Sequence, residues 1–510
     1  MKAILMGGGM GGLATAINLL DLGLDVSLVE ADEIFGGRAS SWLDEDGDMI
    51  DNALHVFFPY YVNLLEFFKK IGIYENIAWK NTEFYYALPG GKQAVLRFKQ
   101  LPAPFHAAFA FANMLKDYKE ISPLKVIVAG FPLASGLFMS KEKIDELDNI
   151  SMATWVYRWA SLDGLRPMEP GINGLTFTPS WGVSAKVMLN WGMKVMGSAE
   201  NARVGFANGG LGEIWVDNCL DYIRSKGGDV GLGKAVTSIN VEGSKIKNVV
   251  VNDSEVMEAD LYISAISPYA LRRVLPDESF NYEYFRDLWH FQHAPSMSLQ
   301  VWFDRKLTDV DVTFFSSDCI FNTYADLSNV LPHIFKGGSM FEMVLSPADH
   351  VQGLPDQVIF DIAIEEIQDR FPIAREAEVK KWKVVRERQG VYRHSPGMEA
   401  HRPFQRSPYP NFYLTGDYTK THVSSGGMEA AIWNANKVTE LIAADKLGTN
   451  ISLNKEFESN EPIMKYIKPL TYGGMAAAGC RFPGAVAEAV QEVELLRAIK
   501  KSRAITGPAP

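Results

Sequence analysis

The glycines near the start of the chain have the spacing of a phosphate-binding turn. Gly7, Gly9, Gly11 and Gly12 directly follow the apolar run Met1–Met6. In such a turn the first glycine permits a sharp bend, the next lets the backbone approach a pyrophosphate, and the last lets a helix pack on a strand. The backbone N–H groups at the positive end of that helix can then bind the phosphates.

These glycines need a strand before them and a helix after them, and the sequence predicts both. Met1–Met6 is typical of a buried strand, and Leu13–Leu20 is typical of a helix. A second predicted strand, Asp25–Glu30, ends on a carboxylate that can accept hydrogen bonds from a ribose diol. The order of strand, turn, helix, strand and acid favours a Rossmann-like dinucleotide-binding unit over a fortuitous glycine-rich turn.

A second glycine turn, formed by Gly36, Gly37 and Arg38, follows soon after Glu30. Arg38 can neutralise a phosphate or hold a more distal part of the same ligand. A turn at this place adds contacts beyond the pyrophosphate and therefore favours a long dinucleotide. The alternative interpretation is a surface turn with a solvated arginine.

The far end of the chain is expected to reach the same site. Asn411–Tyr418 is typical of a strand that ends in a glycine turn containing Gly416 and Asp417, and a helix is predicted to begin near Met428. We expect Asp417 to bind ribityl hydroxyls, and the positive end of the helix to stabilise negative charge on a reduced flavin. The cofactor domain is therefore predicted to be discontinuous in sequence.

With these motifs the chain resembles the plant and cyanobacterial type of phytoene desaturase, within the FAD-dependent, amine-oxidase-like flavoproteins. The resemblance spans roughly residues 1–445 and is carried by residues 36–47, 54–58, 301–307, 324–328, 402–408 and 411–420. It implies an α/β fold in which a Rossmann-like FAD-binding domain is interleaved with an α+β substrate domain and a helical, membrane-facing insertion. It also implies hydride transfer from a long apolar isoprenoid to FAD, with a membrane quinone as electron acceptor.

The resemblance extends to individual residues. It implies that Val236 offers its backbone to the adenine, and that Phe57, Phe58 and Trp191 lie beside the substrate. His55 is the catalytic candidate, as a base that could take a proton after hydride loss, although a structural histidine is an equally good interpretation.

The chain departs from the family pattern at three places. Ala53 and Pro59 stand where the family has glycines, and Trp191 stands where it has an arginine. Replacing a permanent charge by an apolar ring changes what can bind there. Desaturation of a carotenoid-like polyene is the favoured function. An isomerase or double-bond reductase acting on an isoprenoid or another lipid, and a flavin amine oxidase, remain alternatives.

The predicted organisation has six parts. The FAD-binding domain comprises residues 1–80, 203–275 and 385–445, and the substrate domain comprises residues 276–384, preceded by a helical, membrane-facing part at residues 81–202. Residues 446–510 form a helical extension outside the resemblance. An amphipathic pattern at residues 485–500 indicates a packing helix or a homo-oligomer contact in preference to a membrane anchor.

Composition agrees with a folded enzyme. The 510 residues are 47% hydrophobic with a net charge of −11, which argues against a nucleic-acid partner. The three cysteines lack the spacing of a metal site or a disulfide framework.

Membrane contact is predicted to be peripheral. No apolar run reaches the length of about 18 residues that a membrane span needs. The apolar segments 101–115 and 124–139 suggest a membrane-surface patch, with helices buried in a substrate domain as the alternative. Because the first predicted strand begins at once, we expect no leader peptide and a cytoplasmic, peripherally membrane-associated protein.

Overall fold

The computed structural model describes residues 1–103, 105–119, 122, 139–158, 162–423 and 426–457. Residues 1–461 form one compact unit and residues 462–510 a second. The second unit lies outside the described residues, and so does the amphipathic segment 485–500 predicted to be a helix.

A five-stranded parallel sheet forms the base of the fold, in the order β19-β13-β1-β2-β9. The central strand β1 (Lys2–Met6) is apolar because it is covered on both faces. It pairs with β2 (Asp25–Val29) and β13 (Leu261–Ser264), and the outer strands are β9 (Asp229–Gly231) and β19 (Phe412–Leu414). All of these strands except β2 come from distant parts of the chain. This confirms the predicted Rossmann-like unit and its discontinuity in sequence.

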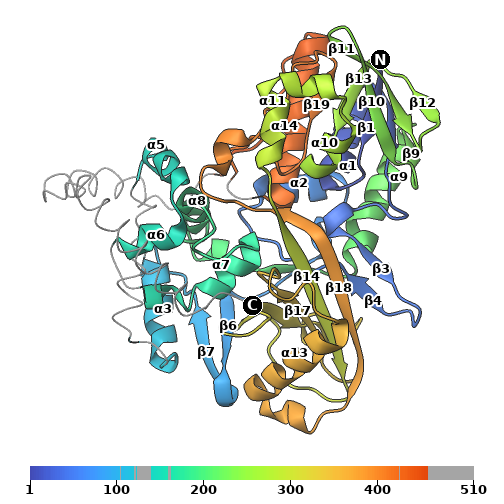
Figure 1. Ribbon diagram of the computed structural model, residues 1–510. Coiled ribbons are helices and arrows are strands. Elements are labelled where there is room, and N and C mark those ends of the chain that lie inside the picture. The colour runs from blue at the N-terminus through green and yellow to red at the C-terminus, as the bar shows by residue number, and fades with distance from the viewer. Residues whose placement is uncertain (104, 120–121, 123–138, 159–161, 424–425, 458–510) are drawn as a thin grey trace, which may run out of the picture. The chain divides into compact units, whose positions relative to one another are not determined.

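Three helices cover this sheet: α1 (Met10–Asp21), α9 (Asp217–Ser225) and α14 (Met428–Leu447). Their buried faces share one hydrophobic core with β1 and β2 (Figure 1). A short helix, α2 (Val62–Lys70), packs against α14, and small strands β3 (Ser41–Leu43) and β4 (Met49–Asp51) form a separate pair.

An antiparallel three-stranded sheet follows β9, with strands β10 (Val236–Glu242), β11 (Lys245–Val251) and β12 (Glu255–Met257). The first two strands match the predicted hairpin. The third was not predicted, because a strand of three residues is too short to establish an alternating pattern. Helices α10 (Pro268–Val274) and α11 (Glu283–Arg286) come next in the chain.

The second large sheet has seven strands in the order β18-β14-β17-β16-β15-β6-β7. Helix α13 (Asp356–Arg370) packs on it, and the long strands β14 (His293–Phe303) and β18 (Val379–Tyr392) run from it towards the parallel sheet (Figure 1). The other strands are β6 (Glu83–Leu88), β7 (Lys92–Arg97), β15 (Phe314–Phe315), β16 (Thr323–Asp326) and β17 (Met340–Leu345).

The structure differs from the predicted organisation at two boundaries. Residues 81–202 were expected to be largely helical, but they begin with β6 and β7, which join the seven-stranded sheet. The boundary at residue 385 falls inside β18, which stays paired with β14 as far as Tyr392. Both differences arise because pairing partners that are distant in sequence extend these strands.

The helical part contains α3 (Phe105–Asp117), α5 (Lys141–Asp145), α6 (Met152–Tyr157), α7 (Glu169–Thr176) and α8 (Ala185–Val195). Helix α3 buries one face and exposes Phe105, whereas most of the apolar segment 124–139 lies outside the described residues. Short pieces complete the fold: β5 (Ile77–Trp79), β8 (Gly205–Ala207) and α12 (Leu327–Val330). In the parts of the chain that can be described, none of the helices has the length and hydropathy to cross a bilayer.

Candidate cofactor site and active site

The turn between β1 and α1 requires glycine at two positions. Gly7 has a φ of +103°, a conformation that other residues rarely adopt. A Cβ atom on Gly12 would lie 1.9 Å from the carbonyl oxygen of Gly7. Helix α1 begins after Gly9, which has no side chain to cap it, so the positive end of the helix is available to an anion.

Three glycine segments meet at this turn. A Cβ atom on Gly37 would lie 3.4 Å from the Cα of Gly9, and one on Gly11 would lie 3.2 Å from the Cα of Gly416. Gly9 also pairs with Gly36 as an isolated bridge. The structure therefore brings together the glycines that the sequence assigned to cofactor binding, and they form a cradle of bare backbone.

Glu30 follows β2 and faces this cradle. Its Oε2 accepts a hydrogen bond from Gly8 N–H at 2.6 Å, and its Oε1 accepts one from Asp32 N–H at 3.0 Å. A carboxylate offers about four lone-pair sites, so both oxygens can accept further bonds. Lys234 N–H donates to the carbonyl of Glu30 at 2.7 Å, which brings the start of β10, and with it Val236, beside the same site.

Arg38 and Asp417 form an ion pair across the site, in which Asp417 is buried and the side chain of Arg38 is 42% exposed. Nη2 of Arg38 lies 2.7 Å from Oδ1 of Asp417, and its Nη1 donates to the carbonyl of Gly390 at 2.9 Å. Oδ2 of Asp417 accepts from Gly427 N–H, the residue before Met428 and helix α14, at 3.1 Å. Burial opposes ionisation of Asp417, but the charge and hydrogen bond of Arg38 outweigh it and lower its pKa.

Glu429, in the first turn of α14, was not singled out in the sequence. Its Oε1 accepts from the backbone and side-chain N–H groups of Asn63 at 3.1 and 2.8 Å, and its Oε2 accepts from Leu64 N–H at 2.8 Å. Burial raises the pKa of Glu429 even though these bonds favour its ionised form. The carboxyl group thus caps helix α2, a contact across 365 residues that no local pattern could reveal.

His55 is held as a neutral imidazole. Its Nδ1 lies 2.5 Å from the carbonyl oxygen of Ala53, which requires a proton on Nδ1 and leaves Nε2 as an acceptor. Burial and the positive charge of Arg38 together lower the pKa of His55 to about 4, although the hydrogen bond to Ala53 opposes them. A weakly basic histidine next to the cradle could accept a proton only transiently.

The three predicted substrate residues are distributed over two cores. Phe57 packs edge-on against Phe68, with ring centroids 5.4 Å apart, in the core of the cofactor domain. Phe58 stacks on Tyr60 at 5.1 Å, and Nε1 of Trp191 donates to the hydroxyl of Tyr60 at 2.9 Å. Phe58 and Trp191 thus belong to one aromatic cluster, from which Phe57 is separate.

The residues present fit a dinucleotide cofactor. The bare glycine cradle, the carboxylate of Glu30 and the positive end of α1 match a ribose and a pyrophosphate. In addition, both ring nitrogens of His293 are shielded from water and lack a hydrogen-bond partner in the described structure. The charges of Arg38 and Asp417 act on this ring, so an uncompensated polar group lies beside the cradle.

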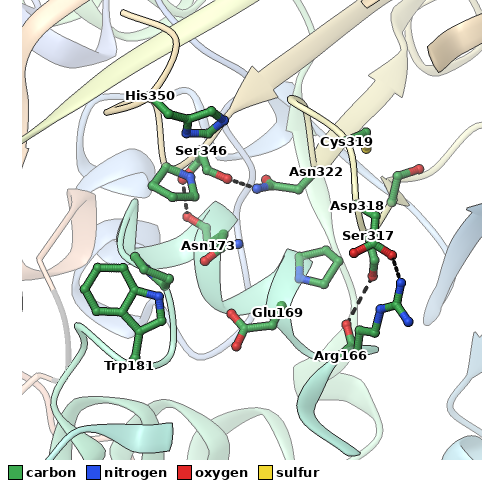
Figure 2. A pocket seen from close by; sticks show the side chains of 14 residues that line it. Arg166, Glu169, Asn173, Trp181, Ser317, Asp318, Cys319, Asn322, Ser346 and His350 are labelled. Atoms are coloured by element: carbon green, nitrogen blue, oxygen red, sulfur yellow. Dashed lines mark hydrogen bonds and ion pairs between the residues drawn. The ribbon is translucent and has the colours of Figure 1, made fainter. Parts of the chain in front are cut away.

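A cavity of about 270 Å³ lies between α7 and the ends of β15, β16 and β17 (Figure 2). Its wall carries the polar side chains of Glu169, Asn173, Asn322 and Ser346 and the exposed ring of Trp181. The carboxyl and amide groups among these side chains would lose their hydration against a long hydrocarbon, so we do not assign this cavity as the apolar tunnel that the resemblance implies.

The fold and the cradle define a dinucleotide-dependent oxidoreductase, and comparisons with known proteins agree. The chain matches the family of flavin-containing amine oxidoreductases over residues 10–443. It is 28% identical over 459 residues to a 15-cis-phytoene desaturase of Synechococcus elongatus, covering 87% of this chain and 96% of that protein. It is 27% identical over 479 residues to a zeta-carotene desaturase of Synechocystis, covering 88% and 98%.

A solved structure of an oxidoreductase from Methanosarcina mazei superposes with a TM-score of 0.66 at 19% identity, covering 86% of this chain and 100% of that one. This likeness shows the fold. The match to the flavin-containing amine oxidoreductase family spans most of this chain, so the chain belongs to that family. It is a flavin-dependent oxidoreductase, and the predicted resemblance to carotenoid desaturases is confirmed.

Proposed function

We propose that this protein is an FAD-dependent desaturase that removes a hydride from a long apolar isoprenoid of the carotenoid type. The observation that carries the proposal is the similarity, over 87% and 88% of the chain, to a phytoene desaturase and a zeta-carotene desaturase. FAD is the proposed flavin because the cradle has, beyond its first glycine turn, a second turn at Gly37 and the Arg38–Asp417 link near α14.

In this proposal the glycine cradle and Glu30 bind the adenosine and pyrophosphate parts of FAD, with the backbone of Val236 at the adenine. Arg38, Asp417 and the N-terminus of α14 after Gly427 hold the flavin end. When bound, FAD supplies a two-electron hydride acceptor. The chain itself contributes orientation and the exclusion of water.

The substrate is proposed to lie against the aromatic cluster of Phe58, Tyr60 and Trp191. The polar groups of Tyr60 and Trp191 bond to each other, so the cluster can present apolar surface to a hydrocarbon. His55 is proposed to lie near the reacting carbons, where its Nε2 could accept a proton.

Membrane contact and a quinone acceptor complete the proposal. Leu101 and Phe105, 36% and 59% exposed, give the region of α3 an apolar surface. Such side chains suit the boundary between head groups and acyl chains, where an isoprenoid and a quinone both dissolve. We place the protein at the cytoplasmic face of a membrane as a peripheral enzyme. A homo-oligomer contact through the C-terminal extension is a further part of the proposal.

The test is anaerobic incubation of the FAD-loaded protein with phytoene in lipid vesicles. Bleaching of the flavin absorbance together with a product that absorbs at longer wavelength is the expected result. Hydrogen peroxide production driven by amines, with no reaction of phytoene, would instead identify an amine oxidase.

A second function, isomerisation or reduction of an isoprenoid or other lipid double bond, is favoured by one observation. Trp191, at the place of the family's arginine, is neutral and engaged with Tyr60, so it offers no cation to an acceptor or a polar substrate end. This function predicts that phytoene leaves the flavin oxidised. It also predicts that an external electron donor is needed and yields a saturated or isomerised product.

A further inference from the structure

Two acidic side chains from distant parts of the chain meet next to His55. Asp51 ends β4, Glu342 lies on β17, and Gln300 lies opposite Glu342 on β14. Nε2 of Gln300 donates to the backbone carbonyl of Asp51 at 3.0 Å and to Oε1 of Glu342 at 3.3 Å. The amide of Gln300 therefore ties the two acidic residues together.

This cluster has acceptor atoms that nothing in the described structure satisfies. Glu342 is 1% exposed and Gln300 is fully buried, yet Oε2 of Glu342 and Oε1 of Gln300 have no hydrogen-bond partner. A purely structural cluster would pair its buried acceptors, because each unpaired one costs about 1–3 kcal/mol. The unpaired atoms indicate a site that exchanges a proton or a ligand.

The charges around the cluster do not neutralise it. Burial raises the pKa of Asp51 to about 7, and burial together with the charge of Asp51 raises the pKa of Glu342. No described basic side chain contributes to either pKa, and His55 is the other titratable group in the same place. The charge of Asp51 opposes ionisation of the buried Glu342, and no described base offsets it, so the pair retains a proton near neutral pH.

A small cavity lies between the acidic pair and the core that contains Phe58 and Tyr60. Its volume of about 20 Å³ is enough for one water molecule. Asp51, His55 and Glu342 line it together with Phe206, Leu327 and Leu331. These three apolar residues belong to the same hydrophobic core as Phe58 and Tyr60. A water molecule in this cavity could carry a proton to the acidic pair from a substrate that lies against this core.

We propose that Asp51 and Glu342 share one proton and accept a second, through the cavity beside His55, when the substrate loses hydrogen. This inference rests on the proposed desaturase function. One substrate carbon gives a hydride, with both bonding electrons, to the flavin. The neighbouring carbon loses a proton to the carboxylate of the pair, and the electrons of that C–H bond become the new π bond. The pair changes from a monoanion to two neutral acids.

The experiment compares Glu342→Gln and Asp51→Asn with Glu366→Gln. Glu366 is the matched control because burial raises its pKa to about 7 as well, but it lies on α13 and accepts from Ile320 N–H. Each variant is first checked for retained FAD absorbance. The rate of anaerobic flavin reduction by phytoene is then measured as a function of pH, and the protonated-carboxyl infrared band is recorded without substrate.

Glu342→Gln is expected to slow flavin reduction by about 100-fold or more, the usual range for losing a general base, and to remove an infrared band. In Asp51→Asn the rising limb of the pH–rate profile should move to higher pH, because Glu342, the more deeply buried of the two acids, must then ionise alone to accept a proton. Glu366→Gln should keep the wild-type profile.

Three outcomes overturn the inference, and the first of them leaves the proposed function standing. If phytoene reduces the wild type, and Glu342→Gln and Asp51→Asn react at the wild-type rate with its pH profile, the pair has no role although the desaturase function stands. If phytoene does not reduce the wild-type flavin, the desaturase function fails, and this role fails with it. Absence of a protonated-carboxyl band sensitive to Glu342→Gln refutes the shared proton in either case.

Discussion

The capping of α2 by Glu429 gives a prediction that depends only on the fold. Glu429→Ala removes the acceptors of three hydrogen bonds, from Asn63 N–H, the Asn63 side chain and Leu64 N–H. Tyr61, the residue before the helix, provides no side-chain cap of its own. The substitution therefore leaves the first turn of α2 without a partner inside a buried region.

The magnitude follows from those bonds. At about 1 kcal/mol net for each hydrogen bond, the loss is about 3 kcal/mol. This is somewhat above the range of about 0.5–2 kcal/mol for a single N-cap because one bond to the Asn63 side chain is also lost, although that side chain keeps its bonds to Lys455. With an unfolding entropy of about 2 cal/mol/K per residue, a chain of this length should lose only about 3 °C in Tm. The local effect on α2 should exceed the global one.

Hydrogen exchange read by mass spectrometry is therefore the main assay, with thermal unfolding beside it. Peptides covering residues 58–70 should exchange faster in Glu429→Ala, whereas peptides from α13 should not change. Glu365→Ala, at an exposed position on α13, is the control for removal of a helical glutamate. Unchanged protection of residues 58–70 in Glu429→Ala, with a Tm equal to that of the control, would show that the carboxyl group does not hold α2.

Three further predictions concern the cradle and the aromatic cluster. Gly12→Ala should abolish FAD retention, read by absorbance after gel filtration, whereas Gly171→Ala, whose added methyl meets open space, should keep it. Asp417 has a lowered pKa, so its stabilising effect is present above its unfolded pKa of about 3.8 and is lost as pH falls through its folded value. In Asp417→Asn the melting temperature should therefore fall less steeply than in the wild type as the pH is lowered. Trp191→Phe should cost about 1 kcal/mol in urea unfolding, for the lost bond to Tyr60.

The cofactor half of the molecule was predictable because its signals are local. The apolar run before Gly7, the glycine spacing and the acid at Glu30 lie within 30 residues, and each requirement follows from backbone geometry. The convergence of Gly416 on the same cradle was inferred from a second local motif. The structure confirmed both, since sheet order and glycine contacts follow from these motifs.

The substrate half was less predictable because its strands and side chains come together through pairing between segments that are far apart in sequence. Strands β6 and β7 lie in a part of the sequence dominated by helices, and they are recruited by β15, more than 200 residues away. In the sequence, Gln300 and Glu342 are ordinary polar residues within two strand patterns. Only the pairing of those strands places them side by side next to Asp51. Glu429 is likewise informative only once α14 lies against α2.

The cradle has a consequence for how the protein is made. The cradle is formed by backbone at residues 9, 37 and 416, and Asp417 accepts a hydrogen bond from the N–H of Gly427. A ribosome must therefore release more than four-fifths of the 510 residues before the last wall can close. Until then the cofactor site of the nascent chain is incomplete, so flavin binding can only follow synthesis of the C-terminal motif.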